Sequence, residues 1–182
     1  MTETVKSDEI YIVISQTGTL LSRILKGITH KNYNHASITP YNDLHVMYSF
    51  GRLNPYNPFW AGFVTESADF GTFKRFSETE IMVISVKIDS ETYQNMCTAF
   101  EDMLKYPKNY HYNYFGLWLA AFDIVVTAKN RYYCSEFVRE FLKQHSVEGS
   151  ENLDAIIHPM NFLSLPDATP IYKGKLKNFK VS

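Results

Sequence analysis

The order in which strand-like and helix-like segments follow one another is the feature that most limits what this chain can fold into. Runs rich in β-branched and aromatic residues predict strands. These runs lie at residues 10–15, 35–39, 44–50 and 81–88, and a further edge strand is expected at 169–179. Most of the helical patterns come after residue 88, and residues 51–63, rich in Asn, Pro and Gly, are expected to form a loop. Because helices and strands are segregated, the sequence predicts an α+β fold with an antiparallel sheet packed against helices.

Four segments carry apolar residues at the spacing of an amphipathic helix. They cover residues 20–28, 90–105, 114–128 and 134–145. Asp89 or Ser90 is expected to cap the second helix. The apolar stripe of that helix comprises Tyr93, Met96, Cys97, Phe100 and Leu104. The most apolar run of the chain, residues 115–126, is shorter than the roughly 20 residues that cross a bilayer, so we expect a buried helix and no transmembrane segment.

Length, charge and cysteine content narrow the class of protein. The 182 residues suit one domain over residues 1–182, with residues 1–8 expected to be flexible. The 18 basic and 19 acidic residues give a net charge of -1, which carries no signature of nucleic-acid or anionic-membrane binding. Two cysteines are too few for a disulfide framework, and the polar start lacks the features of a secretory signal, so a cytoplasmic protein is expected.

Cys134 is the candidate nucleophile because it lies where an aromatic, extended segment passes into a helix. A sulfur at a helix N-terminus faces unpaired backbone N–H groups and the positive end of the helix dipole, and both stabilise a thiolate. The backbone N–H of Ser135 is a candidate oxyanion donor for the same reason. Cys97 lies on an apolar helical stripe and is expected to be a small buried side chain. A structural cysteine at a helix start is also common, so position alone does not establish catalysis.

A thiolate nucleophile needs a base within hydrogen-bond distance, and the chain contains six histidines. His35 begins a predicted strand and is followed by small residues, which would hold an imidazole rigidly and leave space for a substrate. His45 lies on the strand expected to pair with it. The other four fall in expected loops or at helix ends, where solvated histidines are ordinary: His30, His111, His145 and His158.

Three segments resemble the circularly permuted branch of the NlpC-type papain-like superfamily, which includes YiiX-like proteins and the lecithin retinol acyltransferase group. They are residues 34–38, 48–52 and 133–138, and the Tyr-Cys-Ser-Glu core of the last is the most specific. In that branch the base comes before the nucleophile, and here His35 precedes Cys134 by 99 residues. The resemblance extends from about residue 10 to residue 179. It implies a papain-like fold in which Cys134 is the nucleophile and His35 the base.

The third residue of the family is polar, lies on the strand after the base and orients the imidazole. His or Glu is usual there, and this chain departs from the pattern with Ser49 at the best match. Strand alternation places His45 and Ser49 on one face, so we prefer Ser49, with His45, Tyr48 and Glu66 as alternatives. A shift of one residue in register would present Tyr48 instead.

The resemblance implies a cysteine hydrolase of the amidase or peptidase type, acting on a small peptide- or amide-like substrate through a thioester intermediate. Two alternatives stay open: an acyltransferase of the lecithin retinol acyltransferase type, and a binding module that has lost efficient chemistry. The balanced charge weighs against a lipid substrate, and the weak third position favours the binding module. The chain has neither zinc-ligand spacing nor a phosphate-binding loop, and no metal or organic cofactor is expected.

Overall fold

The computed structural model describes residues 7–16, 33–54, 56–57, 60–120, 122, 124–126 and 128–180. The helix expected at residues 20–28 lies outside the described residues. Of the segment expected to be flexible, residues 7 and 8 belong to the first strand and residues 1–6 lie outside the description.

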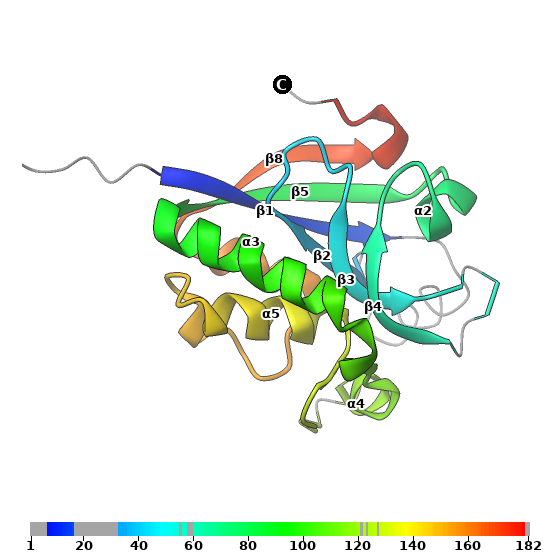
Figure 1. Ribbon diagram of the computed structural model, residues 1–182. Coiled ribbons are helices and arrows are strands. Elements are labelled where there is room, and N and C mark those ends of the chain that lie inside the picture. Colours follow the sequence, from blue (N-terminus) through cyan, green and yellow to red (C-terminus); the bar gives the residue numbers. More distant parts are fainter. Residues whose placement is uncertain are drawn as a thin grey trace, which may run out of the picture.

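The described residues form a mixed α+β structure built on one eight-stranded sheet (Figure 1). Its strands are β1 Ser7–Gln16, β2 His35–Thr39, β3 Met47–Arg52, β4 Ala61–Glu66, β5 Glu80–Asp89, β6 His111–Tyr112, β7 Arg131–Tyr132 and β8 Ala168–Lys175. The helices are α2 Gly71–Arg75, α3 Ser90–Lys105, α4 Tyr114–Ala120 and α5 Cys134–Gln144, with short 3-10 turns at Pro107–Asn109, Ser150–Asn152, Pro159–Ser164 and Leu176–Asn178. The α+β class predicted from the order of segments is confirmed.

The sheet has the order β7-β6-β4-β3-β2-β1-β5-β8, and all neighbouring strands are antiparallel except β6 and β7. The expected hairpin between β2 and β3 is confirmed, as is the edge position of β8. The long strands β1 and β5 pair over their whole length because both are rich in β-branched residues, which suit a pleated, buried surface.

Two hydrophobic cores lie on opposite faces of the sheet. Alternation along β1 sends Ile10, Ile12 and Ile14 to one core and Tyr11 and Val13 to the other. Helices α3 and α5 run side by side over the first face (Figure 1). The short helix α2 contributes to the core on the second face.

Helix α3 begins as the sequence predicted. The Asp89 carboxylate accepts a hydrogen bond from the Thr92 backbone N–H at 2.8 Å, which caps the helix. Phe100 is almost fully buried and stacks on Tyr48 and Phe141, at ring-centroid distances of 4.2 and 4.4 Å. These stacked rings join the helical layer to β3.

The predicted stripe of α3 is wrong in part. Met96, Phe100 and Met103 are its buried residues, whereas Leu104 is exposed and Cys97 is only partly buried. Only the side of α3 that carries Met96, Phe100 and Met103 is buried, so residues at the border of the predicted apolar stripe are partly or fully exposed.

Two boundaries also differ from expectation. The strand expected at 44–50 begins at Met47, because the chain turns over residues 42–46 and Leu44 has a left-handed backbone conformation with φ of 56°. The loop expected at 51–63 contains the start of β4 at Ala61.

The helix expected at 114–128 is the largest correction. Helix α4 ends at Ala120, and several of its large apolar side chains are exposed rather than buried. The β-branched residues from Ile124 to Thr127 lower the helix propensity of the second half of this run. Among the described residues, no helix combines the length and the apolar character needed to cross a membrane.

Candidate active site

His35 is the first residue of β2, where its backbone pairs with Ser15 of β1. Its side chain is 15% exposed, so the ring is largely enclosed by the structure. Gly51 lies close to the ring: a Cβ at this position would come within 3.6 Å of His35 Cε1 and 3.3 Å of a Glu66 carboxylate oxygen. Glycine therefore leaves the space in which the two side chains meet.

Glu66, the last residue of β4, holds the imidazole. Its two carboxylate oxygens each lie 3.0 Å from His35 Nε2. Ser37, two residues after His35, donates a hydrogen bond to the same carboxylate at 2.6 Å. The Glu66 side chain is 10% exposed, so water screens this pair only weakly. The hydrogen bond from Ser37 fixes the carboxylate, which in turn fixes the ring.

The charge of Glu66 changes the protonation of His35. Burial on its own lowers the pKa of His35, because a charged ring loses its hydration. The Glu66 carboxylate, and after it the Cys134 sulfur, outweigh this effect and raise the pKa well above the usual 6.5. Hydrogen bonds from the ring to both side chains act in the same direction. A protonated ring at neutral pH is thereby favoured, as a thiolate–imidazolium pair requires.

The preference for Ser49 as the partner of His35 is corrected by this geometry. Ser49 is fully buried, and its hydroxyl donates to the Ala36 carbonyl oxygen at 2.7 Å. Its oxygen is 3.5 Å from His35 Nε2, farther than either Glu66 oxygen. The reason is the pairing of β3 with β4, which sets Met47 opposite Glu66 and so carries the carboxylate to the base.

The other two alternatives do not reach the ring. The Tyr48 side chain lies in the core on the opposite face of β3, stacked on Phe100. His45 precedes β3 in an exposed turn, where its ring pairs with Asp43. The polar face of β3 predicted from alternation therefore contributes Ser49 alone to the surroundings of His35.

Cys134 is the first residue of α5, as the sequence predicted, and the residue is 4% exposed. Its sulfur lies 3.9 Å from the carbonyl oxygen of Asn34, the residue immediately before His35. Since Glu66 occupies Nε2, the other ring nitrogen, Nδ1, is the one available to the thiol. The structure thus brings Cys134, His35 and Glu66 together in that order.

The start of α5 is held by buried polar contacts. The Glu136 carboxylate accepts a hydrogen bond from the Tyr133 backbone N–H at 3.2 Å and lies 3.4 Å from the Asn113 amide. Burial raises the pKa of Glu136, against the opposing effect of these two hydrogen bonds. The side chain thus caps the helix from within, and the backbone N–H groups of Cys134 and Ser135 belong to the first, unpaired turn.

An open pocket lies directly beside Cys134. Its walls are mainly apolar and include Tyr33, Leu117, Ala120, Ile156 and Pro159. Two buried side chains of α5 fix the segment that forms one wall. The Ser135 hydroxyl donates to the Ile157 carbonyl oxygen at 2.8 Å, and Arg139 donates to the Asp154 carbonyl oxygen at 2.8 Å.

Tyr112 is a site residue that the sequence reasoning missed. It is 9% exposed and lies close enough to Cys134 to be affected by its charge. Burial raises the pKa of Tyr112 well above its usual value, and Cys134 adds to the effect. The hydroxyl therefore stays protonated at neutral pH. Nothing in the sequence marked this position, because β6 is only two residues long.

Of the other histidines, His158 lines the pocket beside Cys134, the His145 ring pairs with the Phe141 carbonyl oxygen, and His30 lies outside the described residues. Within the described part of the chain, no three or more His, Cys, Asp or Glu side chains are arranged to bind a metal ion. Both cysteines are free thiols. Burial raises the pKa of Cys97, although a hydrogen bond with Tyr93 opposes the effect. A raised pKa leaves less of the thiol as reactive thiolate, so Cys97 is a suitable internal reference for the reactivity of Cys134.

No protein-family model matches the chain, and a search of curated proteins finds no significant similarity to any of them.

Proposed function

We propose that this chain is a cysteine hydrolase of the circularly permuted papain-like type, acting on an amide or ester carbonyl. One observation carries the proposal: His35 lies between the thiol of Cys134 and the carboxylate of Glu66, with the Glu66 oxygens 3.0 Å from Nε2. A nucleophile, a base and a group that orients the base are the parts that covalent acyl transfer requires.

In the proposed reaction the Cys134 thiolate attacks the carbonyl carbon of the substrate. The negative charge that develops on the carbonyl oxygen is stabilised by backbone N–H groups of the first turn of α5, with the Tyr112 hydroxyl as a further donor. The tetrahedral intermediate collapses, and the leaving amine or alcohol takes a proton from His35. A thioester remains on Cys134.

Water completes the cycle. His35, now neutral, removes a proton from a water molecule, which attacks the thioester carbonyl. The carboxylic acid leaves, and the thiolate and the protonated ring are restored. Throughout, Glu66 is a positioning residue, because it keeps Nε2 occupied and presents Nδ1 to the sulfur.

The pocket beside Cys134 defines the class of substrate. Apolar walls formed by Leu117, Ala120 and Ile156 suit an uncharged, apolar group close to the scissile carbonyl. The Ser135 hydrogen bond to Ile157 holds this wall against the nucleophile helix, so that the pocket and the sulfur keep a constant separation. We therefore expect small amides or esters with an apolar acyl part to react best.

An activated ester tests the proposal without knowledge of the natural substrate. Incubation with p-nitrophenyl acetate should release a burst of nitrophenol, approaching one equivalent per chain, and leave an acetyl group on Cys134. Mass spectrometry of the peptides locates the acetyl group, and neutral hydroxylamine should remove it, as expected for a thioester. Product analysis with added amines or alcohols separates hydrolysis from acyl transfer.

Matched variants decide the result. Cys134→Ser and His35→Ala should abolish the burst, whereas Cys97→Ala should retain it. Acetylation of both cysteines at similar rates, or a burst that survives His35→Ala in a folded protein, would overturn the proposal and favour a binding module.

A further inference from the structure

The segment formed by α4 and the residues after it presents large apolar side chains to solvent. Five of them are exposed: Phe115 by 67%, Phe122 by 64%, Val125 by 51%, Ile124 by 49% and Trp118 by 42%. We call these five residues the α4 tip. Soluble proteins seldom expose so many large apolar side chains in one short stretch, and such patches mark interaction sites. The stretch is the same apolar run that the sequence led us to expect in the core.

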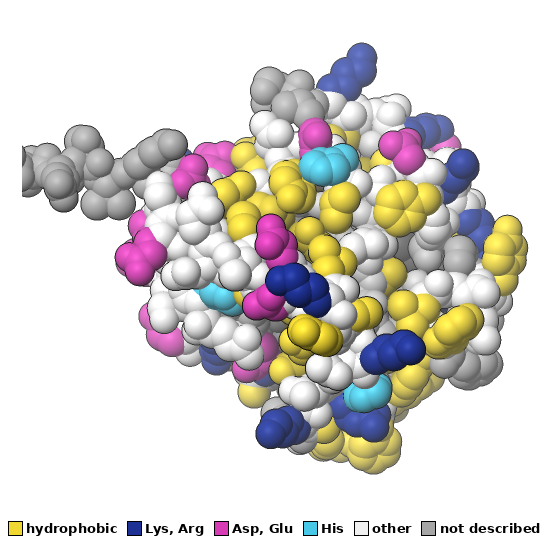
Figure 2. All heavy atoms as spheres, viewed as in Figure 1, with side chains coloured by type: hydrophobic (Ala, Val, Ile, Leu, Met, Phe, Trp, Pro, Cys, Tyr) yellow, Lys and Arg dark blue, Asp and Glu magenta, His cyan; other side chains and the backbone are white. Residues whose placement is uncertain are grey.

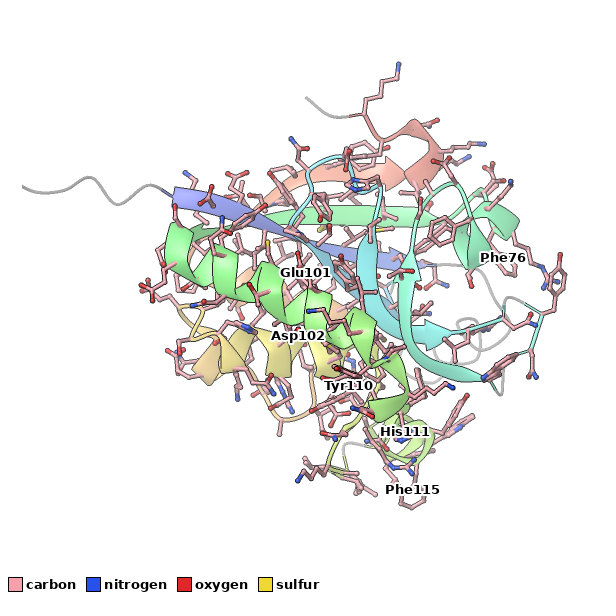
Figure 3. All side chains as sticks on the ribbon, in the orientation of Figure 1. Phe76, Glu101, Asp102, Tyr110, His111 and Phe115 are labelled. Atoms are coloured by element: carbon pink, nitrogen blue, oxygen red, sulfur yellow. The ribbon has the colours of Figure 1, made fainter. Side chains whose placement is uncertain are left out.

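Helix α4 has two different faces. Gly116 and Ala120 are buried, and Leu117 and Ala120 line the pocket beside Cys134. Phe115 and Trp118 belong to the exposed set. In Figure 3, Phe115 lies at the outer end of the molecule, away from the sheet. The α4 tip is therefore the outer surface of the element whose inner surface forms the candidate substrate pocket.

Basic residues flank the α4 tip in the sequence. Lys108, Lys129 and Arg131 are all exposed. The parallel pairing of β6 with β7 sets Arg131 beside His111, a few residues before α4. Figure 2 shows hydrophobic side chains next to Lys, Arg and His side chains at this end of the molecule, and Figure 3 labels His111 and Phe115 there. Between residues 107 and 131 the sequence contains one acidic residue, Asp123.

We propose that the α4 tip docks on the surface of an anionic phospholipid bilayer. Phe and Trp side chains would enter the interfacial region, where amphipathic aromatic rings are favoured. The basic residues around them would contact the lipid phosphates, each raising the partition coefficient about fivefold. A protein partner for an apolar patch does not require this rim of positive charge, which complements an anionic surface.

The balanced net charge of the chain does not oppose this binding. The net charge of -1 is the sum over the whole chain, whereas electrostatic attraction to a membrane acts only over about 8 Å in physiological salt. Within residues 107–131 the sequence carries three Lys or Arg residues against one acidic residue. Docking in this orientation brings the pocket beside Cys134 close to the bilayer surface. The binding itself does not depend on the proposed hydrolase activity.

Vesicle sedimentation tests the proposal with the full chain carrying Cys134→Ser, so that lipid chemistry cannot interfere. Sucrose-loaded vesicles of phosphatidylcholine with about 30 mol% phosphatidylserine supply the anionic surface. We expect binding at least about tenfold stronger than to phosphatidylcholine alone, and a marked loss in about 0.5 M NaCl. Equal binding to both kinds of vesicle, or none to either, would overturn the proposal.

Paired variants locate the surface. The double variant Phe115→Ser, Phe122→Ser should weaken partitioning about tenfold or more, because two phenyl rings no longer enter the interface. The control pair Trp60→Ser, Ile171→Ser removes two other exposed apolar side chains, 57% and 49% exposed, and should bind as the parent does. Equal loss in the two pairs would show that no particular surface is responsible.

Two measurements complete the test. The double variant Lys129→Glu, Arg131→Glu should abolish the preference for vesicles with phosphatidylserine. Because it changes different residues, it tests membrane binding even if the Phe pair fails to fold. Size-exclusion chromatography without lipid should give a monomer for the parent and the Phe pair. A dimer that the Phe pair abolishes would show that a second copy covers the α4 tip, and would overturn membrane docking.

Discussion

Replacing Glu66 with Gln examines the link between the base and its partner. The change removes a negative charge 3.0 Å from His35 Nε2 and keeps the size of the side chain. At an effective dielectric constant of about 20, two unit charges at this separation attract by about 5.5 kcal/mol, which is an upper limit. The glutamine amide retains a hydrogen bond to the ring, and the desolvation cost of a charged ring remains.

We therefore expect a net loss of about 1.5–3 kcal/mol, the range for hydrogen bonds to charged groups. This loss of stabilisation applies to the proposed thiolate–imidazolium pair, because only the protonated ring interacts with the full charge of Glu66. Since about 1.4 kcal/mol corresponds to tenfold, Cys134 in Glu66→Gln should react roughly 10- to 150-fold more slowly than in the parent near neutral pH.

Brief treatment with iodoacetamide, followed by mass spectrometry of the peptides, measures this rate. Cys97 in the same molecule serves as the internal reference, because its surroundings do not include Glu66. Glu148→Gln is the matched control, as it changes an exposed glutamate on another part of the surface. An unchanged ratio of Cys134 to Cys97 labelling in folded Glu66→Gln would refute the role of Glu66 in the site.

Three further predictions follow from the packing and charges of this region. Gly51→Ala should slow the labelling of Cys134, though less than Glu66→Gln, because the new Cβ would lie 3.3 Å from a Glu66 oxygen and displace it. Labelling at the parent's rate would show that the site can accommodate the extra methyl group. Phe100→Ala should lower the free energy of unfolding by about 3–5 kcal/mol in urea titrations, since a fully packed ring leaves a cavity; a loss below 1 kcal/mol, roughly, would mean that the core collapses to fill it. Glu66 raises the pKa of His35, so the protonated ring stabilises the fold fully at pH values below the usual pKa of 6.5. This stabilisation is lost as the pH rises through the raised pKa. Thermal melts should accordingly show the largest difference between parent and Glu66→Gln just below pH 6.5, and a constant difference at all higher pH would contradict the linkage.

The strands could be predicted well because burial on both faces leaves a strong local pattern. Residues 81–88 form an almost continuous β-branched and apolar run, and β5 covers it from Glu80 to Asp89. Capping chemistry was equally local, since Asp89 binds the backbone only three residues ahead. The positions of Cys134 and His35 at the start of their elements followed from the same kind of short-range signal.

The partner of His35 could not be predicted with the same certainty because it depends on register between strands. Glu66 and His35 lie 31 residues apart, and only the pairing of β3 with β4 brings them together. The exposed position of α4 was missed for a different reason. Apolar content was taken to mean burial, whereas hydrophobic residues also form surfaces that bind other molecules.

The separation of Cys134 from Asn34 by 100 residues has a consequence for how the protein folds. Helices such as α3 form from neighbouring residues, but the docking of α5 against the start of β2 closes a very long loop, and such contacts are slow to form. The enhanced reactivity that we propose for Cys134 would depend on that docking, whereas a free thiol in an unfolded chain would have none of it. Pulsed alkylation during refolding would thus time one tertiary event, the docking of α5 against the start of β2, independently of the growth of helical structure.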